Sequence, residues 1–239
     1  MELDFMDRIP GLDACVYVGV TGTQAASSIP SLLYGDKSFS GKLVDTIPYT
    51  FEDHPASYST WFGANNYAGS DIGGIDYVEG IYVGYKWFET ADHEGVYNNV
   101  DRSATYGEHA KGYNGVVQYP FGYGLSYSDF KWDVVSVEGK TSDGTIIHPG
   151  DDFVNDKTTF TVKVRVTNTS EVPGRDVVEL YYTPPYYKGQ IEKSAVNLLA
   201  FGKTEILEKN QSQVIELTFA GYDMASYDCY DKNNNNHSG

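Results

Sequence analysis

The residues of this chain that could take part in hydrolysis are carboxylates beside serine hydroxyls. The sequence contains Ser-Asp pairs at residues 70–71, 128–129 and 142–143. A carboxylate can act as a nucleophile, a general acid or a general base when its surroundings tune it. Short polar pairs of this kind occur more often as turns or strand caps. We therefore interpret all three pairs as structural.

A second acidic group lies in ETADHEG, where Asp92, His93 and Glu94 are consecutive. Two acids beside one histidine could suggest acid/base chemistry or a metal site. No H-x-x-x-H or paired-ligand spacing accompanies them, so the sequence does not predict zinc. We expect Glu79, in YVEGIY, to bind backbone amides at the start of a helix. The sequence thus predicts no metal ion and no cofactor.

The segment WFGANNYAGSDIGGIDY offers the most suitable surface for ligand contact. Its rings Trp61, Phe62 and Tyr67 stand in a Gly- and Asn-rich setting that suits stacking on sugar faces. The alternative, which we favour, is that these rings pack against another domain or a second copy of the chain.

Composition limits the classes of partner. The chain has 239 residues and a formal net charge of −16, which disfavours nucleic acid and anionic membrane surfaces but not a neutral sugar. No apolar stretch is long enough to span a bilayer, and the first residues lack the pattern of a signal peptide. The compartment stays undetermined. Cys15 and Cys229 do not form a disulfide framework, and we expect Cys15 to be buried.

The elements that position these residues change character along the chain. CVYVGV, residues 15–20, predicts a buried strand of a parallel sheet. A helix should follow from Thr23 to a stop at Gly35, with Pro30 inside it. Residues 36–126 show no sustained period, although one helix or strand is expected within VEGIYVGYKWFE.

From residue 128 the pattern becomes that of antiparallel strands. In TTFTVKVRVTN the apolar residues from Phe160 to Val166 alternate with polar ones, and Ile215, Leu217 and Phe219 do the same. We predict strands near 130–137, 159–168, 176–183, 197–206 and 213–220, with another at 224–230. Short strands with this spacing indicate a β-sandwich.

Several motifs in a fixed order resemble glycoside hydrolase family 3, the β-glucosidase family. IPGLDACVYVGV and SFSGKL resemble the end of its α/β sandwich domain, although Phe39 stands where the family usually has Pro. YVEGIYVGYKWFET and YPFGYGLSYSDF resemble two further family segments. Residues 158–219, including VTNTSEVPGRDVVELYY and KTEIL, resemble its fibronectin type III-like domain.

The resemblance implies a two-part fold. Residues 1–126 would be the C-terminal part of the α/β sandwich domain with a long aromatic, Gly-rich loop. Residues 127–239 would be an all-β fibronectin type III-like sandwich that lacks its last strand. Such an incomplete sandwich would leave open strand edges, so we expect the fragment to self-associate. The beginning of the sequence likewise suggests that Met1 is not the start of the natural fold.

The resemblance also implies a function: retaining exo-glycosidase chemistry on a β-linked glucoside or oligosaccharide. The family's nucleophile is an Asp in a Ser-Asp-Trp type motif on a TIM-like barrel, and its acid/base is usually a Glu upstream of the IPGxDA segment. The strands and helices expected in this chain cannot supply the eight βα units of that barrel, which take about 250 residues by themselves. Ser128-Asp129-Phe130 therefore only mimics the motif. We expect no catalytic residue in this chain, which would supply scaffold and the outer wall of the active site and be inactive alone. The alternative is a free-standing carbohydrate-binding or adhesive module of the fibronectin type.

The segment YPFGYGLSY stands at the predicted boundary. Gly122 and Gly124 would allow turns that a Cβ forbids. Its four aromatic rings would bury large areas and fix the two parts together, rather than form a sugar platform. They are Tyr119, Phe121, Tyr123 and Tyr127.

Overall fold

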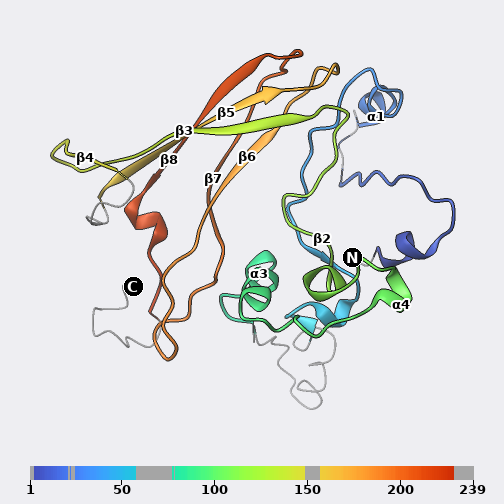
Figure 1. The fold of residues 1–239 in the computed structure, drawn as a ribbon, viewed down its shortest axis with the longest axis horizontal. Helices are drawn as coiled ribbons and strands as arrows, with labels where there is room; N and C mark the ends of the chain where they lie inside the picture. Colours follow the sequence, from blue (N-terminus) through green and yellow to red (C-terminus); the bar gives the residue numbers. More distant parts are fainter. Residues whose placement is uncertain are drawn as a thin grey trace.

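The computed structural model describes residues 3–20, 22, 25–57, 77, 79–148 and 157–228. The described chain is mostly β-sheet with few helices (Figure 1). Trp61, Phe62 and Tyr67 lie outside the described residues, as do Ser70, Asp71 and Cys229.

Two antiparallel sheets make up the C-terminal half (Figure 1). The larger sheet has the order β4-β3-β5-β8, with β3 at Phe130–Lys140, β4 at Ile146–Ile147, β5 at Thr159–Asn168 and β8 at Ser212–Ala220. The smaller sheet is the pair β6, Val177–Tyr182, and β7, Asn197–Lys203. A short 3-10 helix, η5, follows β8 at Gly221–Met224.

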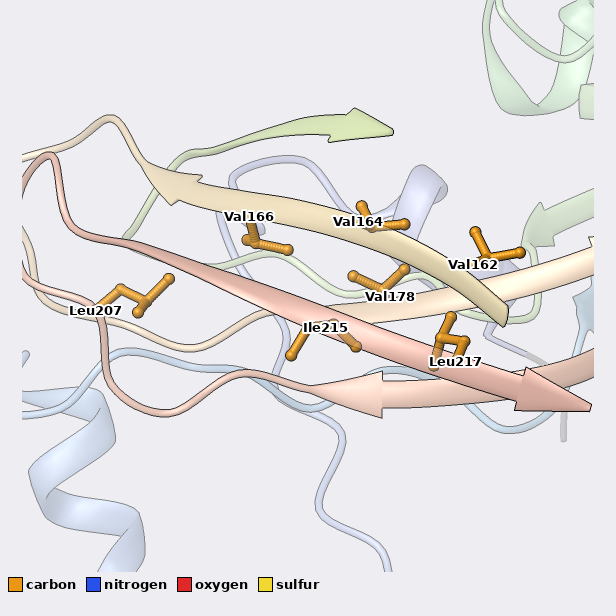
Figure 2. Packing of buried hydrophobic residues seen from close by; sticks show 7 residues of the cluster. All are labelled: Val162, Val164, Val166, Val178, Leu207, Ile215 and Leu217. Atoms are coloured by element: carbon orange, nitrogen blue, oxygen red, sulfur yellow. The ribbon is translucent and has the colours of Figure 1, made fainter. Parts of the chain in front are cut away.

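The two sheets pack face to face through aliphatic side chains (Figure 2). β5 presents alternate valines inward, and β8 presents Ile215 and Leu217 opposite Val178 of β6. Phe160 and Phe219 stack at one end of this core with ring centroids 5.2 Å apart. The alternation of apolar residues therefore predicted the inward face correctly, because each inward residue sits in a layer that excludes water.

Five of the predicted strands are confirmed, with ends that differ from the prediction by at most three residues. The strand predicted at 224–230 was wrong over its described part, since η5 ends at Met224 and residues 225–228 belong to neither sheet. The sequence missed β4, which pairs only with Gly139 and Lys140 of β3. A strand of two residues carries no periodic signal that a sequence could reveal.

The N-terminal half is built from short elements. These are η1 (Asp4–Arg8), α1 (Ala25–Leu33), β1 (Ile47–Pro48), η2 (Phe51–Asp53), α3 (Tyr85–His93), α4 (Ser103–Tyr106), η4 (Gly112–Gly115) and β2 (Val117–Tyr119). β1 pairs antiparallel with β2. One cluster surrounds the buried Phe88 of α3, and Tyr49 stacks on Tyr106 in another.

Two expectations for the first helix agree with the structure. Pro30 lies inside α1, and Gly35, with φ +81°, ends the turn that follows it. The helix or strand expected within VEGIYVGYKWFE is a helix, α3, which begins inside this segment and continues to His93.

The buried strand predicted at residues 15–20 was wrong. Within the described ranges this segment pairs with no strand, and Val16, Tyr17 and Val20 are exposed, as is Cys15. An apolar run becomes a buried strand only when neighbouring strands supply hydrogen bonds and a covering layer. The described part of the chain offers neither at this place.

Candidate functional site

The Ser-Asp pairs that the structure describes are structural. Ser128 is buried, and its Oγ donates a hydrogen bond of 3.0 Å to Ser38 Oγ. The backbone N–H of Asp129 donates to Ser170 Oγ at 3.2 Å. These bonds hold the segment that leads into β3, which supports the interpretation of Ser128-Asp129 as a turn or strand cap.

Asp143 closes the β3–β4 turn. Its carboxylate accepts hydrogen bonds from the Thr141 hydroxyl and from the backbone N–H of Thr145. The hydrogen bond from the Thr141 hydroxyl has the largest effect, and together these bonds lower the pKa of Asp143 to about 2. A carboxylate held this firmly in its ionised form caps a turn and is a poor general acid.

The segment 119–128 forms the centre of a junction between distant parts of the chain. Its backbone lies along residues 41–43: Gly122 N–H donates to the Leu43 carbonyl and Leu43 N–H to the Tyr123 carbonyl, both at 2.8 Å. Lys42 Nζ donates to the Gly124 carbonyl at 2.9 Å. Gly122 has φ +78°, and a Cβ on Gly124 would lie 2.3 Å from the Gly41 carbonyl oxygen. Both glycines are therefore required, one by its conformation and one by the close approach of two backbones.

The aromatic rings of this segment contact rings from other elements. Phe121 lies 4.8 Å from Tyr85 of α3, and Tyr85 lies 6.1 Å from Tyr181 of β6, measured between ring centroids. Tyr127 meets Phe39 edge-on at 5.4 Å. Such edge and tilted arrangements are the favoured geometries of packed aromatic pairs. These contacts support the packing interpretation of YPFGYGLSY, but Tyr123 and Tyr127 stay 37% and 46% exposed, so not every ring buries a large area.

Helix α3 links the two halves. On one side Phe88 and Ala91 are buried in the N-terminal cluster. On the other side the Tyr85 hydroxyl accepts the Leu198 N–H and Thr90 Oγ1 accepts the Ala195 N–H, each at 2.9 Å. Figure 1 shows α3 beside the connection between β6 and β7. The helix thus supplies hydrogen-bond acceptors to backbone amides at the start of β7.

A cleft of about 240 Å³ opens between the C-terminal end of α3 and the β6–β7 connection. We call it the α3–β6 cleft. Its lining combines rings, hydroxyls and charged groups from two segments a hundred residues apart: Tyr82, Thr90, His93, Glu94, Thr183, Pro184, Tyr186, Lys193, Ser194 and Ala195.

Tyr82 ties the two walls of this cleft together. Its hydroxyl donates to Glu192 Oε2 at 2.6 Å, and its ring meets Trp87 edge-on at 6.4 Å. Burial, followed by this hydrogen bond to a carboxylate, raises the pKa of Tyr82 above its ordinary value. The phenol is therefore a stable donor and not a proton source at neutral pH.

The acids at the cleft are Glu94, which lines it, and Glu192, which is bound to Tyr82. Both side chains are exposed. The general acid of a glycosidase lies in a desolvated environment, but Glu94 and Glu192 are both exposed to solvent. His93 and Glu94, first noted as possible metal ligands, instead line this cleft. Among the described residues, no group of three His, Cys, Asp or Glu side chains could hold a metal ion.

Sequence reasoning missed the β6–β7 half of the cleft. The sequence analysis identified no ligand-binding residue in TPPYYKG, residues 183–189, although Tyr186 in this segment lines the cleft. Two adjacent tyrosines after two prolines were the available signal. Glu79 Oε2 is buried and makes no hydrogen bond within the described part of the chain, so this oxygen does not bind the amides at the start of a helix.

Comparisons with known proteins give the family. Residues 2–85 match the glycosyl hydrolase family 3 C-terminal domain. Beta-glucosidase A of Butyrivibrio fibrisolvens is 34% identical over 211 residues, 88% of this chain and 21% of that protein. A beta-glucosidase of Ruminococcus albus is 32% identical over 229 residues, 95% of this chain and 19% of that protein. The chain thus spans about a fifth of the length of these curated relatives.

Most of this chain also matches solved structures of beta-glucosidases. A beta-glucosidase from Paenibacillus barengoltzii has a TM-score of 0.62 at 33% identity, over 86% of this chain and 18% of that one. Beta-glucosidase 3B from Thermotoga neapolitana has a TM-score of 0.61 at 27% identity, over 87% of this chain and 23% of that one. Across the described ranges, no helix is both long and apolar enough to cross a membrane. The sequence and structure matches together place the chain in glycosyl hydrolase family 3, with the family's C-terminal domain at residues 2–85.

Proposed function

We propose that this chain is the scaffold portion of a retaining exo-glycosidase of the β-glucosidase type. It holds the outer wall of an active site whose catalytic carboxylates lie on other polypeptide. The observation that carries the proposal is the junction at residues 119–128. It joins the family-matching N-terminal part, α3 and β6 into one packed unit, and the similarity to beta-glucosidases extends over 88–95% of the chain.

The assignment of the C-terminal half as fibronectin type III-like is part of the proposal. Two antiparallel sheets packed through alternating inward residues support it. In the described part of the chain, β3, β5 and β8 lie in one sheet, and β6 pairs with β7 in the other. We assign residues 127–239 to this domain and residues 1–126 to the α/β sandwich domain.

The nature of the acids supports the view that catalysis lies elsewhere. A retaining mechanism needs two carboxyl groups about 5–5.5 Å apart around one sugar. Asp129 and Asp143 belong to turns, and the carboxylates at the α3–β6 cleft are exposed. The expected partners are a β-linked glucoside or oligosaccharide and a TIM-like barrel that carries the nucleophile.

The coding sequence on both sides of these residues tests the proposal. We expect an adjoining barrel with a Ser-Asp-Trp type motif, and we expect the protein containing both to hydrolyse an aryl β-glucoside. Changing the Asp of that motif to Asn should abolish turnover. A reading frame without a barrel, whose product binds immobilised glucan without cleaving it, would instead establish the alternative of a free-standing carbohydrate-binding module.

A further inference from the structure

The ring contacts of Tyr85 with Phe121 and Tyr181 help to hold the junction together, and none of these three residues lines the α3–β6 cleft. We propose that the cleft binds one neutral pyranose ring of a glycan. This inference rests on the proposed function for its choice of ligand class, but it concerns binding and not hydrolysis.

The walls of the cleft are held in place before any ligand arrives. Tyr82 is bound to Glu192 across the cleft, and Thr90 Oγ1 accepts the Ala195 N–H at 2.9 Å. Ser194 is buried, and its hydroxyl donates to Asn197 Oδ1 at 2.6 Å. A site fixed in this way loses little conformational entropy on binding, so even a small ligand can be held.

The size of the cleft selects a small ligand. Its volume of about 240 Å³ falls below the roughly 300–1,000 Å³ typical of pockets for drug-sized molecules. One sugar ring is the appropriate scale, and an extended oligosaccharide would have to continue outside the cleft.

The polar groups match a ligand that donates and accepts hydrogen bonds at once. Thr183 offers a hydroxyl, Lys193 donates, Glu94 accepts, and His93 can do either according to its tautomer. Sugar hydroxyls have the same dual character. The positive charge of Lys193 is offset by Glu94 and the nearby Glu192, so the cleft has no net attraction for a phosphate or a carboxylate.

The rings supply the apolar part of the recognition. Tyr186 is 38% exposed and lines the cleft beside the buried Pro184. A partly exposed ring at the edge of a polar cleft can cover the C–H face of a pyranose while its hydroxyl stays in water. The next residue, Tyr187, is 69% exposed and does not line the cleft, which makes it a matched control.

The test is calorimetric titration of the 239-residue chain with methyl β-glucoside. We expect saturable binding with a Kd on the order of 1 mM. Y186A should weaken it about fivefold, the effect of losing one ring contact, whereas Y187A should leave it unchanged. E94Q, on an exposed side chain that is not needed for folding, should also weaken binding, and thermal unfolding of each variant checks that the fold is intact.

Three outcomes would overturn the inference. These are no saturable binding, equal loss in Y186A and Y187A, or tighter binding of glucose 6-phosphate, which would indicate an anion site. None of them bears on whether an adjoining barrel hydrolyses glucosides, so the inference can fail while the proposed function stands.

Discussion

At the scale of single residues, the close backbone contact at Gly124 is the most restrictive feature of the junction. A Cβ there would lie 2.3 Å from the Gly41 carbonyl oxygen and 3.3 Å from its carbon. Since both atoms belong to backbone, neither can rotate away. G124A should therefore lower the free energy of unfolding by about 1–3 kcal/mol, the usual cost of overpacking.

Gly41 provides the matched control for this prediction. A Cβ on Gly41 would meet nothing within 4 Å, so G41A should change stability by less than about 0.5 kcal/mol. Urea denaturation followed by circular dichroism measures both. Equal stability of G124A and the unaltered chain would show that the two segments do not approach as closely as described.

Glu89 of α3 should make the free energy of unfolding depend on pH. Burial raises the pKa of this half-buried carboxyl, and the hydrogen bond from the Tyr113 hydroxyl opposes that rise only in part. An acid whose pKa is raised on folding favours the folded state fully below its ordinary pKa, and this contribution is lost as the pH rises through the raised value. E89Q keeps a hydrogen-bond acceptor for Tyr113 but cannot ionise, so its stability should not fall in this way as the pH rises.

We expect E89Q and the unaltered chain to unfold at the same temperature near pH 4, with E89Q the more stable at neutral pH. The exposed Glu138 supplies the control, since E138Q should follow the unaltered chain at every pH. Thermal melts across this range measure the difference. If the difference in unfolding temperature between E89Q and the unaltered chain became smaller as the pH rises, the pKa of Glu89 would not be raised on folding.

At the scale of elements, the docking of α3 on β7 depends on a few directional contacts. The Tyr85 hydroxyl accepts the Leu198 N–H at 2.9 Å. Y85F keeps the ring contacts with Phe121 and Tyr181 but leaves that amide without its acceptor. The expected cost is about 1 kcal/mol, a typical value for one hydrogen bond.

Tyr222 offers a comparison for Y85F, because its ring is 70% exposed. Y222F should be neutral within error. Hydrogen exchange of the Leu198 amide adds a local readout and should speed up in Y85F alone. If Y85F left both stability and exchange unchanged, the helix would not be anchored through this bond.

Strands that are half-buried could be predicted from the sequence, whereas features that depend on distant segments could not. Alternation predicted β5 and β8 because a half-buried strand records its own burial in successive residues. It failed at residues 15–20, where burial depends on strands that the segment itself cannot supply. The α3–β6 cleft was out of reach for a related reason: Glu94 and Tyr186 lie far apart in sequence, and only the docking of α3 brings their segments together.

At the scale of the whole molecule, part of the inward face of the larger sheet, at β3, is left exposed. Trp132, Val134 and Val137 of β3 lie opposite Val166, Val164 and Val162 of β5, so they share the inward face. The β5 valines are buried, yet Val134 is 69% exposed because β6 and β7 cover β5 and β8 instead. Uncovered apolar strands of this kind favour association with a second copy.

The chain should therefore be larger than a monomer by size-exclusion chromatography with light scattering. V134K, which places a charge on this face, should shift it toward the monomer. Val214 lies on the outer face of β8 and is 45% exposed, so V214K should leave the distribution unchanged. A monodisperse monomer of the unaltered chain, with sharp cooperative unfolding, would refute the prediction.

We propose that this chain supports glucoside hydrolysis without carrying the reacting carboxylates. The most direct measurement is turnover of an aryl β-glucoside by the purified 239-residue chain, beside its D129N and E94Q variants. We predict no hydrolysis above the uncatalysed rate for all three proteins. Turnover by the unaltered chain that disappears in D129N or E94Q would place a catalytic carboxylate here and contradict the account.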